Sequence, residues 1–424
     1  MAAASAQDKA GDPAATGKTS PAPLAGFRFI PFRRSDLLEM LRREESLDDE
    51  QLRSFEEAVA AIENAFRDEF HGSRQALKDC YASLDPDADT RYVASADPEA
   101  DAEGSDATEA LRRQLEALLD RANYERLTDA QLKKAFRSSS LFQIRLQVDM
   151  KDFDNVLLYC RGASEREETV PLLFGLIKRR THFVNYDRVV LFLRFADRGS
   201  KTDGDFTPGR VMIKLFQNVP DADLEMLFPN TRVAMRWTDR LLIGVPAVAS
   251  GAIVATTKLG APLILLGTLG GFWLGLHSEP VVLDKRGLLM IGAGFSALGA
   301  YLWKQWSSYR NRKMRFRQAL TRDLYFKLLD NNAGVLLRVL DDAEDSECKE
   351  AFVALYFLLG SSRAMSAEDL DDVIEAWFAR RWQAHLDFEI DDALQKLQRL
   401  GLAEEQEGQW RASQGLSGLS APVL

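Results

Sequence analysis

Residues that could carry catalysis are few in this chain and do not form catalytic motifs. No HExxH, GxSxG or CxxC motif occurs. The three cysteines are widely spaced and odd in number, which predicts neither a zinc site nor a disulfide framework. The four histidines are not paired at metal-ligand spacing: His71, His182, His277 and His385. We therefore expect no catalytic residues, no metal and no cofactor, although the pattern leaves open a pair of carboxylates that meets only in the fold.

Two segments resemble ligand-binding loops but lack their context. Gly11 to Gly17-Lys18-Thr19 is a phosphate loop with one residue too many and no preceding strand. Asp85-x-Asp87-x-Asp89 begins like a calcium loop, but Thr90 replaces the turn glycine and Ala96 replaces the bidentate acid. Neither segment predicts a binding site.

The most informative feature is a nearly continuous apolar run from Leu241 to Trp303. About 20 apolar residues in helical form cross a hydrocarbon core. The run therefore predicts a membrane region over 241–303, with a hairpin of spans at 259–277 and 287–303. A third apolar block, Leu241–Thr257, is richer in small residues and contains Pro246, and whether it crosses stays open.

Basic residues flank the apolar run on both sides, and such residues concentrate on the side that is not translocated. Two crossings satisfy this rule, so we expect an integral membrane protein of a bacterial inner membrane with cytoplasmic soluble domains. The mitochondrial inner membrane is the alternative. The residues expected at the membrane surface are Arg232, Arg236, Arg240, Lys304, Arg310, Arg312, Lys313, Arg315 and Arg317.

Three glycines in the second apolar block repeat every four residues: Gly267, Gly271 and Gly275. On a helix they share one face, where small residues let another helix approach closely. This pattern predicts a helix-packing face. Packing within the hairpin and assembly into a homo-oligomer both remain open.

The remaining chain divides by composition and periodicity. From Phe142 to Met150 apolar and polar residues alternate over nine positions, which predicts a strand. Ser46 with Asp49 predicts a helix start. We expect an α+β soluble region, an α-helical transmembrane hairpin and a mostly helical, winged-helix-like module at the C-terminal end. The expected segments are a disordered tail (1–26), a helical region (27–84), an acidic linker (85–107), an α+β domain with a small antiparallel sheet (108–240), a basic juxtamembrane helix (304–345), the winged-helix-like module (346–412) and a tail (413–424).

The charge of the winged-helix-like module argues against DNA as its ligand. Nine acidic residues stand against four basic ones between Ser366 and Leu400, and the whole chain has a net charge of −10. Such a surface repels phosphates instead of neutralising them. We therefore exclude nucleic acid and expect the module to contact protein.

Several segments resemble the transmembrane-protein-143-like family, a domain of unknown function found in bacteria, plants and animal mitochondria. The segments are Phe29–Leu37, Val211–Pro229 and Leu324–Val335 continuing to Glu347–Ala351, including Asp330-Asn331-Asn332-Ala-Gly334. The resemblance extends from Phe27 to Leu359. It implies an integral membrane protein without established activity, so it assigns no catalytic residue.

Together these patterns predict a non-enzymatic, membrane-anchored protein that presents soluble domains at the bilayer surface. Its expected partners are membrane lipids and a protein, and assembly with a second copy of the chain stays open. One alternative is a small transport or channel component, because Lys258 interrupts the apolar run. A lipid-acting enzyme is the other alternative.

Overall fold

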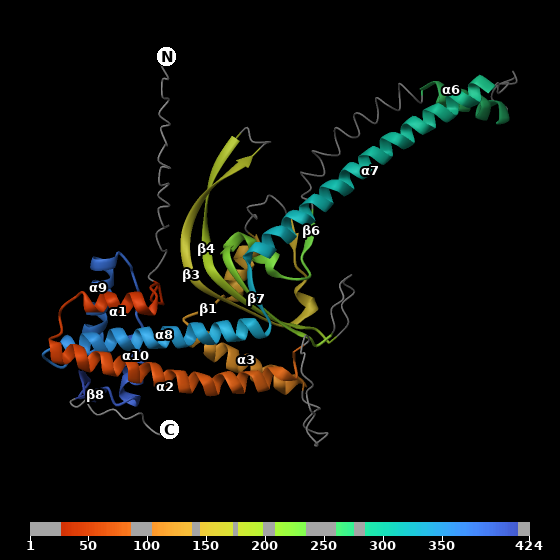
Figure 1. Cartoon of the computed structure of the whole chain (residues 1–424). Coiled ribbons are helices and arrows are strands. Elements are labelled where there is room, and N and C mark those ends of the chain that lie inside the picture. The colour runs from red at the N-terminus through yellow and green to blue at the C-terminus, as the bar shows by residue number, and fades with distance from the viewer. Residues whose placement is uncertain are drawn as a thin grey trace, which may run out of the picture.

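A computed structural model describes residues 27–85, 104–137, 145–172, 177–197, 208–234, 260–274 and 285–413. The chain is mixed α+β. A layer of helices covers one face of a curved antiparallel sheet, and a long helix leaves the body in another direction (Figure 1).

Five strands form the sheet in the order β1-β3-β4-β5-β7, and every neighbouring pair is antiparallel. β3, β4 and β5 follow one another both along the chain and in the sheet, as is usual for antiparallel neighbours. The last strand, β7, follows the end of the long helix that is nearest the body and pairs with β5. The bounds are β1 (Glu125–Arg126), β3 (Phe153–Leu172), β4 (Ile177–Phe195), β5 (Val211–Pro220) and β7 (Leu328–Asn331).

Both faces of the sheet are apolar, so successive side chains along a strand point alternately into two separate cores. Leu157, Tyr159 and Phe192 point to the helical layer. Leu158 and Leu191, one position away in the same strands, belong to the core on the opposite face. The period of two along a strand produces this division.

Strands β3 and β4 extend beyond their neighbours as a two-stranded ribbon. β1 reaches only Cys160, and β5 ends against Asn185. Ala163–Leu172 therefore pairs only with β4 among the described strands. Figure 1 shows this ribbon curving away from the body.

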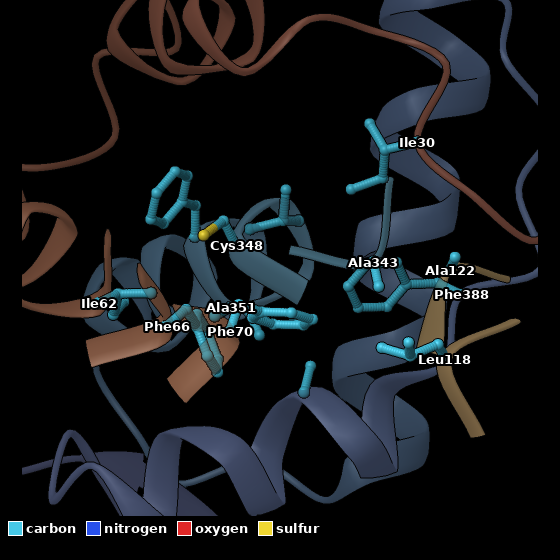
Figure 2. Packing of buried hydrophobic residues seen from close by; sticks show 14 of the residues in the cluster. Ile30, Ile62, Phe66, Phe70, Leu118, Ala122, Ala343, Cys348, Ala351 and Phe388 are labelled. Atoms are coloured by element: carbon cyan, nitrogen blue, oxygen red, sulfur yellow. The ribbon is translucent and has the colours of Figure 1, made fainter. Parts of the chain in front are cut away.

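The helical layer is built around α8, a 28-residue helix that is buried along most of its length. Phe66 and Phe70 from α2 and Leu118 from α3 pack with Cys348 and Ala351 of α8 (Figure 2). The helices of this layer are α1 (Arg34–Arg42), α2 (Asp49–Ala82), α3 (Gly104–Arg121), α8 (Ala333–Gly360), α9 (Ala367–Trp382) and α10 (Ile390–Arg399).

The start of α2 differs from the predicted cap. The side chain of Asp48, and not that of Ser46, accepts hydrogen bonds from the main-chain N–H groups of Glu50 and Gln51. The side-chain oxygen of Gln51 in turn accepts a hydrogen bond from the main-chain N–H of Asp48. These reciprocal bonds satisfy amides that the helix leaves without partners. Ser46 instead donates to the hydroxyl of Tyr356 in α8.

The predicted strand at 142–150 ends earlier than expected. β2 (Arg145–Gln147) is extended and pairs with β6 (Arg232–Ala234), and a short 3₁₀ helix begins at Met150. Residues 138–144 lie outside the described chain. The second core is closed by α4 (Asp129–Arg137) and by the 3₁₀ helix η3 (Asp221–Leu227).

After α9 and α10 the chain forms the hairpin β8 (Ala403–Gln406) and β9 (Gln409–Ala412). Met365, before α9, bridges Trp410 of β9, which ties the hairpin back to the helices. This unit is continuous with the body, because α8 runs through the predicted module boundary at residue 345. Phe27 also bridges Leu386 and anchors the start of the described chain to the same unit.

The predicted transmembrane hairpin is wrong. Among the described residues, no helix combines the length and the apolar character needed to span a bilayer. α6 (Gly260–Trp273) has 14 residues and a length of about 21 Å, short of a hydrocarbon core of about 30 Å. α7 (Lys285–Lys327) has 43 residues, but its apolar part continues without a break into basic turns. The predicted integral membrane location depended on this hairpin and is therefore wrong as well. Residues 241–257 lie outside the described chain.

Candidate functional site

The candidate site is the arm, which we define as α6 and α7. α6 contains no charged residue, and Pro262 stands in its first turn, where a missing N–H costs no helical bond. α7 is rich in Leu, Ala, Lys and Arg, which favour helix. The two helices contact each other, and Figure 1 shows α6 beside the end of α7 that is far from the body.

Large apolar side chains on the arm are exposed. Trp273 is 82% exposed and Leu289 is 73% exposed, whereas the leucines of the body core are almost fully buried. Of the exposed large apolar side chains in the described chain, most lie on the arm: Ile264, Phe272, Trp273, Leu288, Leu289, Phe295, Leu302, Trp303, Trp306, Met314, Tyr325 and Phe326. Large apolar side chains that are exposed together on one part of a protein mark an interaction site.

The first turns of α7 also line an open hollow of about 670 Å³. Its lining includes Leu288, Leu289, Gly292 and Ala293, with Lys285 at one end. A largely apolar lining suits a hydrocarbon chain or an apolar side chain better than a polar substrate.

The glycine face predicted on α6 is only partly described. A Cβ added at Gly267 would meet no atom of the described chain within 4 Å, so none of the described helices approaches closely at this position. Gly271 lies in α6, and Gly275 lies outside the described residues. A packing role for Gly271 and Gly275 stays a prediction.

The second half of α7 is basic. From Gly287 to Arg322 the chain contains no acidic residue, although the protein as a whole is acidic. Lys304, Arg310 and Arg315 are exposed, and within the described chain none of them forms an ion pair. Of the other predicted surface residues, Arg312, Lys313 and Arg317 belong to α7, Arg232 lies in β6, and Arg236 and Arg240 lie outside the described chain.

The base of the arm is fixed to the body by ionic and main-chain contacts. The Lys327 ammonium lies 2.9 Å from a carboxylate oxygen of Asp323 and 3.7 Å from one of Asp223. The side chain of Gln217 in β5 donates to the carbonyl of Phe326. The chain then enters β7 directly, so the arm continues into an edge strand of the sheet.

A cluster of buried charged and polar side chains lies inside the body, around α8. The Lys396 ammonium lies 2.9 Å from Glu347 and 3.0 Å from Glu350, and Arg121 contacts Glu347 at 2.6 Å. Asn123 donates to Glu350 at 2.7 Å. Burial raises the pKa of Glu350, while Lys396 acts in the opposite direction.

A neighbouring cluster joins α8 to the sheet. The Asp342 carboxylate receives the guanidinium groups of Arg161 and Arg188 and the hydroxyl of Tyr124. Burial, followed by the nearby Asp342 charge, raises the pKa of Tyr124 to about 12. The Arg161 guanidinium also lies 4.2 Å from the ring centre of Phe29.

These two clusters hold elements of the body together. Their charges are paired with one another, and buried charges of this kind persist only with such partners. Within the described residues, no group of three or more histidine, cysteine or carboxylate side chains could hold a metal ion. Sequence reasoning missed both clusters, because the acids of α8 meet Arg121, Arg188 and Lys396 only in the fold.

Comparison with known proteins adds one family. A family model described as a protein of unknown function (DUF3754) matches residues 186–334. The match extends from β4 through both helices of the arm to the first residues of α8. No solved structure matches the chain. The similarity therefore covers the arm but assigns no activity to it.

Proposed function

We propose that this protein is a non-enzymatic lipid-binding protein. Its arm binds at a lipid surface, and its body is presented there to a protein partner. The observation that supports the proposal is the exposure of large apolar side chains on α6 and α7, away from both cores of the body. The proposal concerns binding and not the crossing of a bilayer.

The distribution of apolar residues favours lipid over a protein groove for α6. A helix that docks in a groove needs one apolar face and a polar remainder. α6 has apolar or small residues on all sides, with Thr268 as its one polar side chain. Hydrocarbon chains can surround such a helix, whereas a protein groove covers one face.

The aromatic and basic residues of α7 fit the same ligand. Trp303 is exposed where the apolar half of α7 meets the basic half. Tryptophan favours the level of lipid headgroups, because its ring is apolar and its N–H is polar. Exposed cations beyond this point attract anionic lipid, each by on the order of 1 kcal/mol.

Vesicle flotation tests the proposal. Purified full-length protein is mixed with phosphatidylcholine vesicles containing 30% phosphatidylserine, at an order-of-magnitude excess of lipid. We expect the protein to float with the vesicles. Replacing two exposed apolar residues of α6, Ile264→Asn with Trp273→Asn, should weaken binding on the order of 100-fold, since each buried apolar side chain contributes about 1.5–3 kcal/mol.

The matched control replaces two exposed apolar residues of the body, Met150→Asn with Val373→Asn. This variant should float like the unchanged protein. Equal loss in both variants, or no flotation of the unchanged protein, would refute lipid binding by the arm.

A further inference from the structure

The exposed side of α7 carries a regular seam. Its six residues are separated alternately by four and three positions: Leu288, Gly292, Phe295, Gly299, Leu302 and Trp306. Alternating spacings of four and three place residues on one stripe of a helix, as in a coiled coil. The four large members are between 48% and 63% exposed.

The seam is more exposed than the stripe of α7 beside it, where Gly294 is buried and Ile291 and Leu298 are partly buried. A Cβ added at Gly292 or at Gly299 would meet no atom of the described chain within 4 Å, so no described element covers the seam at either glycine. The seam therefore has room for another helix along about 27 Å, the length of 18 residues.

We propose that the seam pairs with the seam of a second copy of this chain, antiparallel to it. In this arrangement Phe295 lies opposite the second copy's Gly299, and Gly292 lies opposite its Leu302. Leu288 then meets Trp306. Each large side chain between the ends fills the space above a glycine, which allows close approach of the helices.

A parallel pair is less complementary. It places Gly292 against Gly292 and leaves a gap, and it places Phe295 against Phe295, where two rings crowd one layer. It also aligns the two basic halves of α7 side by side, whereas the antiparallel pair directs them to opposite ends. The two bodies lie at opposite ends as well. This two-fold pairing uses the same patch on both copies, so it closes as a dimer.

The pairing does not depend on lipid binding, because the seam lies on α7 and the lipid test changes residues of α6. A dimer can bind lipid through α6, and the two proposals fail separately.

Disulfide trapping tests the orientation. Full-length Gly292→Cys and Leu302→Cys proteins are purified separately, mixed, treated with a mild oxidant and run on a denaturing gel without reductant. We expect a covalent dimer in the mixture and none from Gly292→Cys alone. In the antiparallel pair the two copies of position 292 are about 15 Å apart along the axis, beyond the 4.4–6.8 Å that a disulfide allows between Cα atoms.

Two controls make the result specific. The unchanged protein sets the background, since its cysteines are buried or half-buried. A mixture of Ala293→Cys with Ala300→Cys has nearly the same axial offset but lies off the seam, at exposed positions, and should stay monomeric on the gel. A dimer from Gly292→Cys alone would establish a parallel pair, and equal trapping in the off-seam control would indicate random collision; either result overturns the proposal.

Light scattering gives an independent readout. The unchanged protein should have twice the mass of one chain, and Gly299→Leu should have the mass of one chain, because its side chain occupies the space that Phe295 needs. Ala300→Leu adds the same bulk beside the seam and should leave the dimer intact. A single-chain mass for the unchanged protein would refute the pairing.

Discussion

Asn332 and Ile213 are joined by two hydrogen bonds. The main-chain N–H of Asn332 donates to the carbonyl of Ile213 at 2.7 Å, and the Ile213 N–H donates to the side-chain oxygen of Asn332 at 3.3 Å. Asn332 lies between β7 and α8, with φ 49° and ψ −122°. The arm, the sheet and the central helix are thus connected through one residue in a conformation that non-glycine residues rarely adopt.

Replacing Asn332 with alanine should destabilise the protein by about 1–3 kcal/mol, because the strain remains and the side-chain bond to Ile213 is lost. Asn332→Gly should cost less, since glycine relieves the strain. Urea unfolding measures both. Equal stability of the alanine variant and the unchanged protein would show that the side-chain bond to Ile213 contributes nothing.

Replacing Lys396 with methionine should cost about 3–5 kcal/mol, because Glu347 and Glu350 would lose their shared buried cation. The matched change at an exposed ion pair is Arg411→Met, which frees Glu404 at the surface. This control should cost at most about 1 kcal/mol. Similar losses in thermal unfolding would contradict the role assigned to burial.

Asp371 should make stability depend on pH. Burial, then the nearby charges of Glu375 and Asp372, raises its pKa to about 6. The unfolded value is about 3.9, so the folded state binds the proton more tightly. The stability contributed by this residue should therefore rise as pH falls from about 6 to 4 and be absent above pH 7. Asp371→Asn should flatten that part of a urea-midpoint profile, and an unchanged profile would sink the assignment.

Gly162 should tolerate no side chain. Its φ is +69°, and an added Cβ would collide with the carboxylate of Asp187. Gly401 has a similar φ of +71° with open space around it, so Gly401→Ala reports backbone strain alone. We expect Gly162→Ala to cost more than Gly401→Ala, which should cost about 1 kcal/mol, in parallel denaturation curves. Equal costs would mean that the Asp187 side chain moves away freely.

Periodicity located many elements but not their partners. The sequence predicted a small antiparallel sheet within 108–240, and four strands of the sheet lie there: β1, β3, β4 and β5. It placed 304–345 in a helix but missed β7, because the four residues Leu328–Asn331 have no strand pattern of their own. They are extended because β5 offers them a free edge.

The alternation at Phe142–Met150 shows the opposite error. A perfect period of two predicted strand residues up to Met150, yet the paired strand ends at Gln147 and a 3₁₀ helix begins at Met150. The side chain of Asp149 accepts the main-chain N–H of Lys151, and such a local bond competes with strand pairing. The alternation of apolar and polar residues does not report this competition.

Composition and spacing by themselves determined the apolar run, its basic continuation and the alternating α+β elements, since these depend on residues close together in the chain. Only the tertiary structure decided that α6 is too short to cross a bilayer, that Glu347 and Lys396 meet inside the body, and that Leu288, Phe295 and Leu302 stay exposed. The physical reason is the same in each case. Helix length and burial depend on packing between segments distant in sequence, and the free energy of burying a charge or exposing a leucine depends on what those segments place beside it.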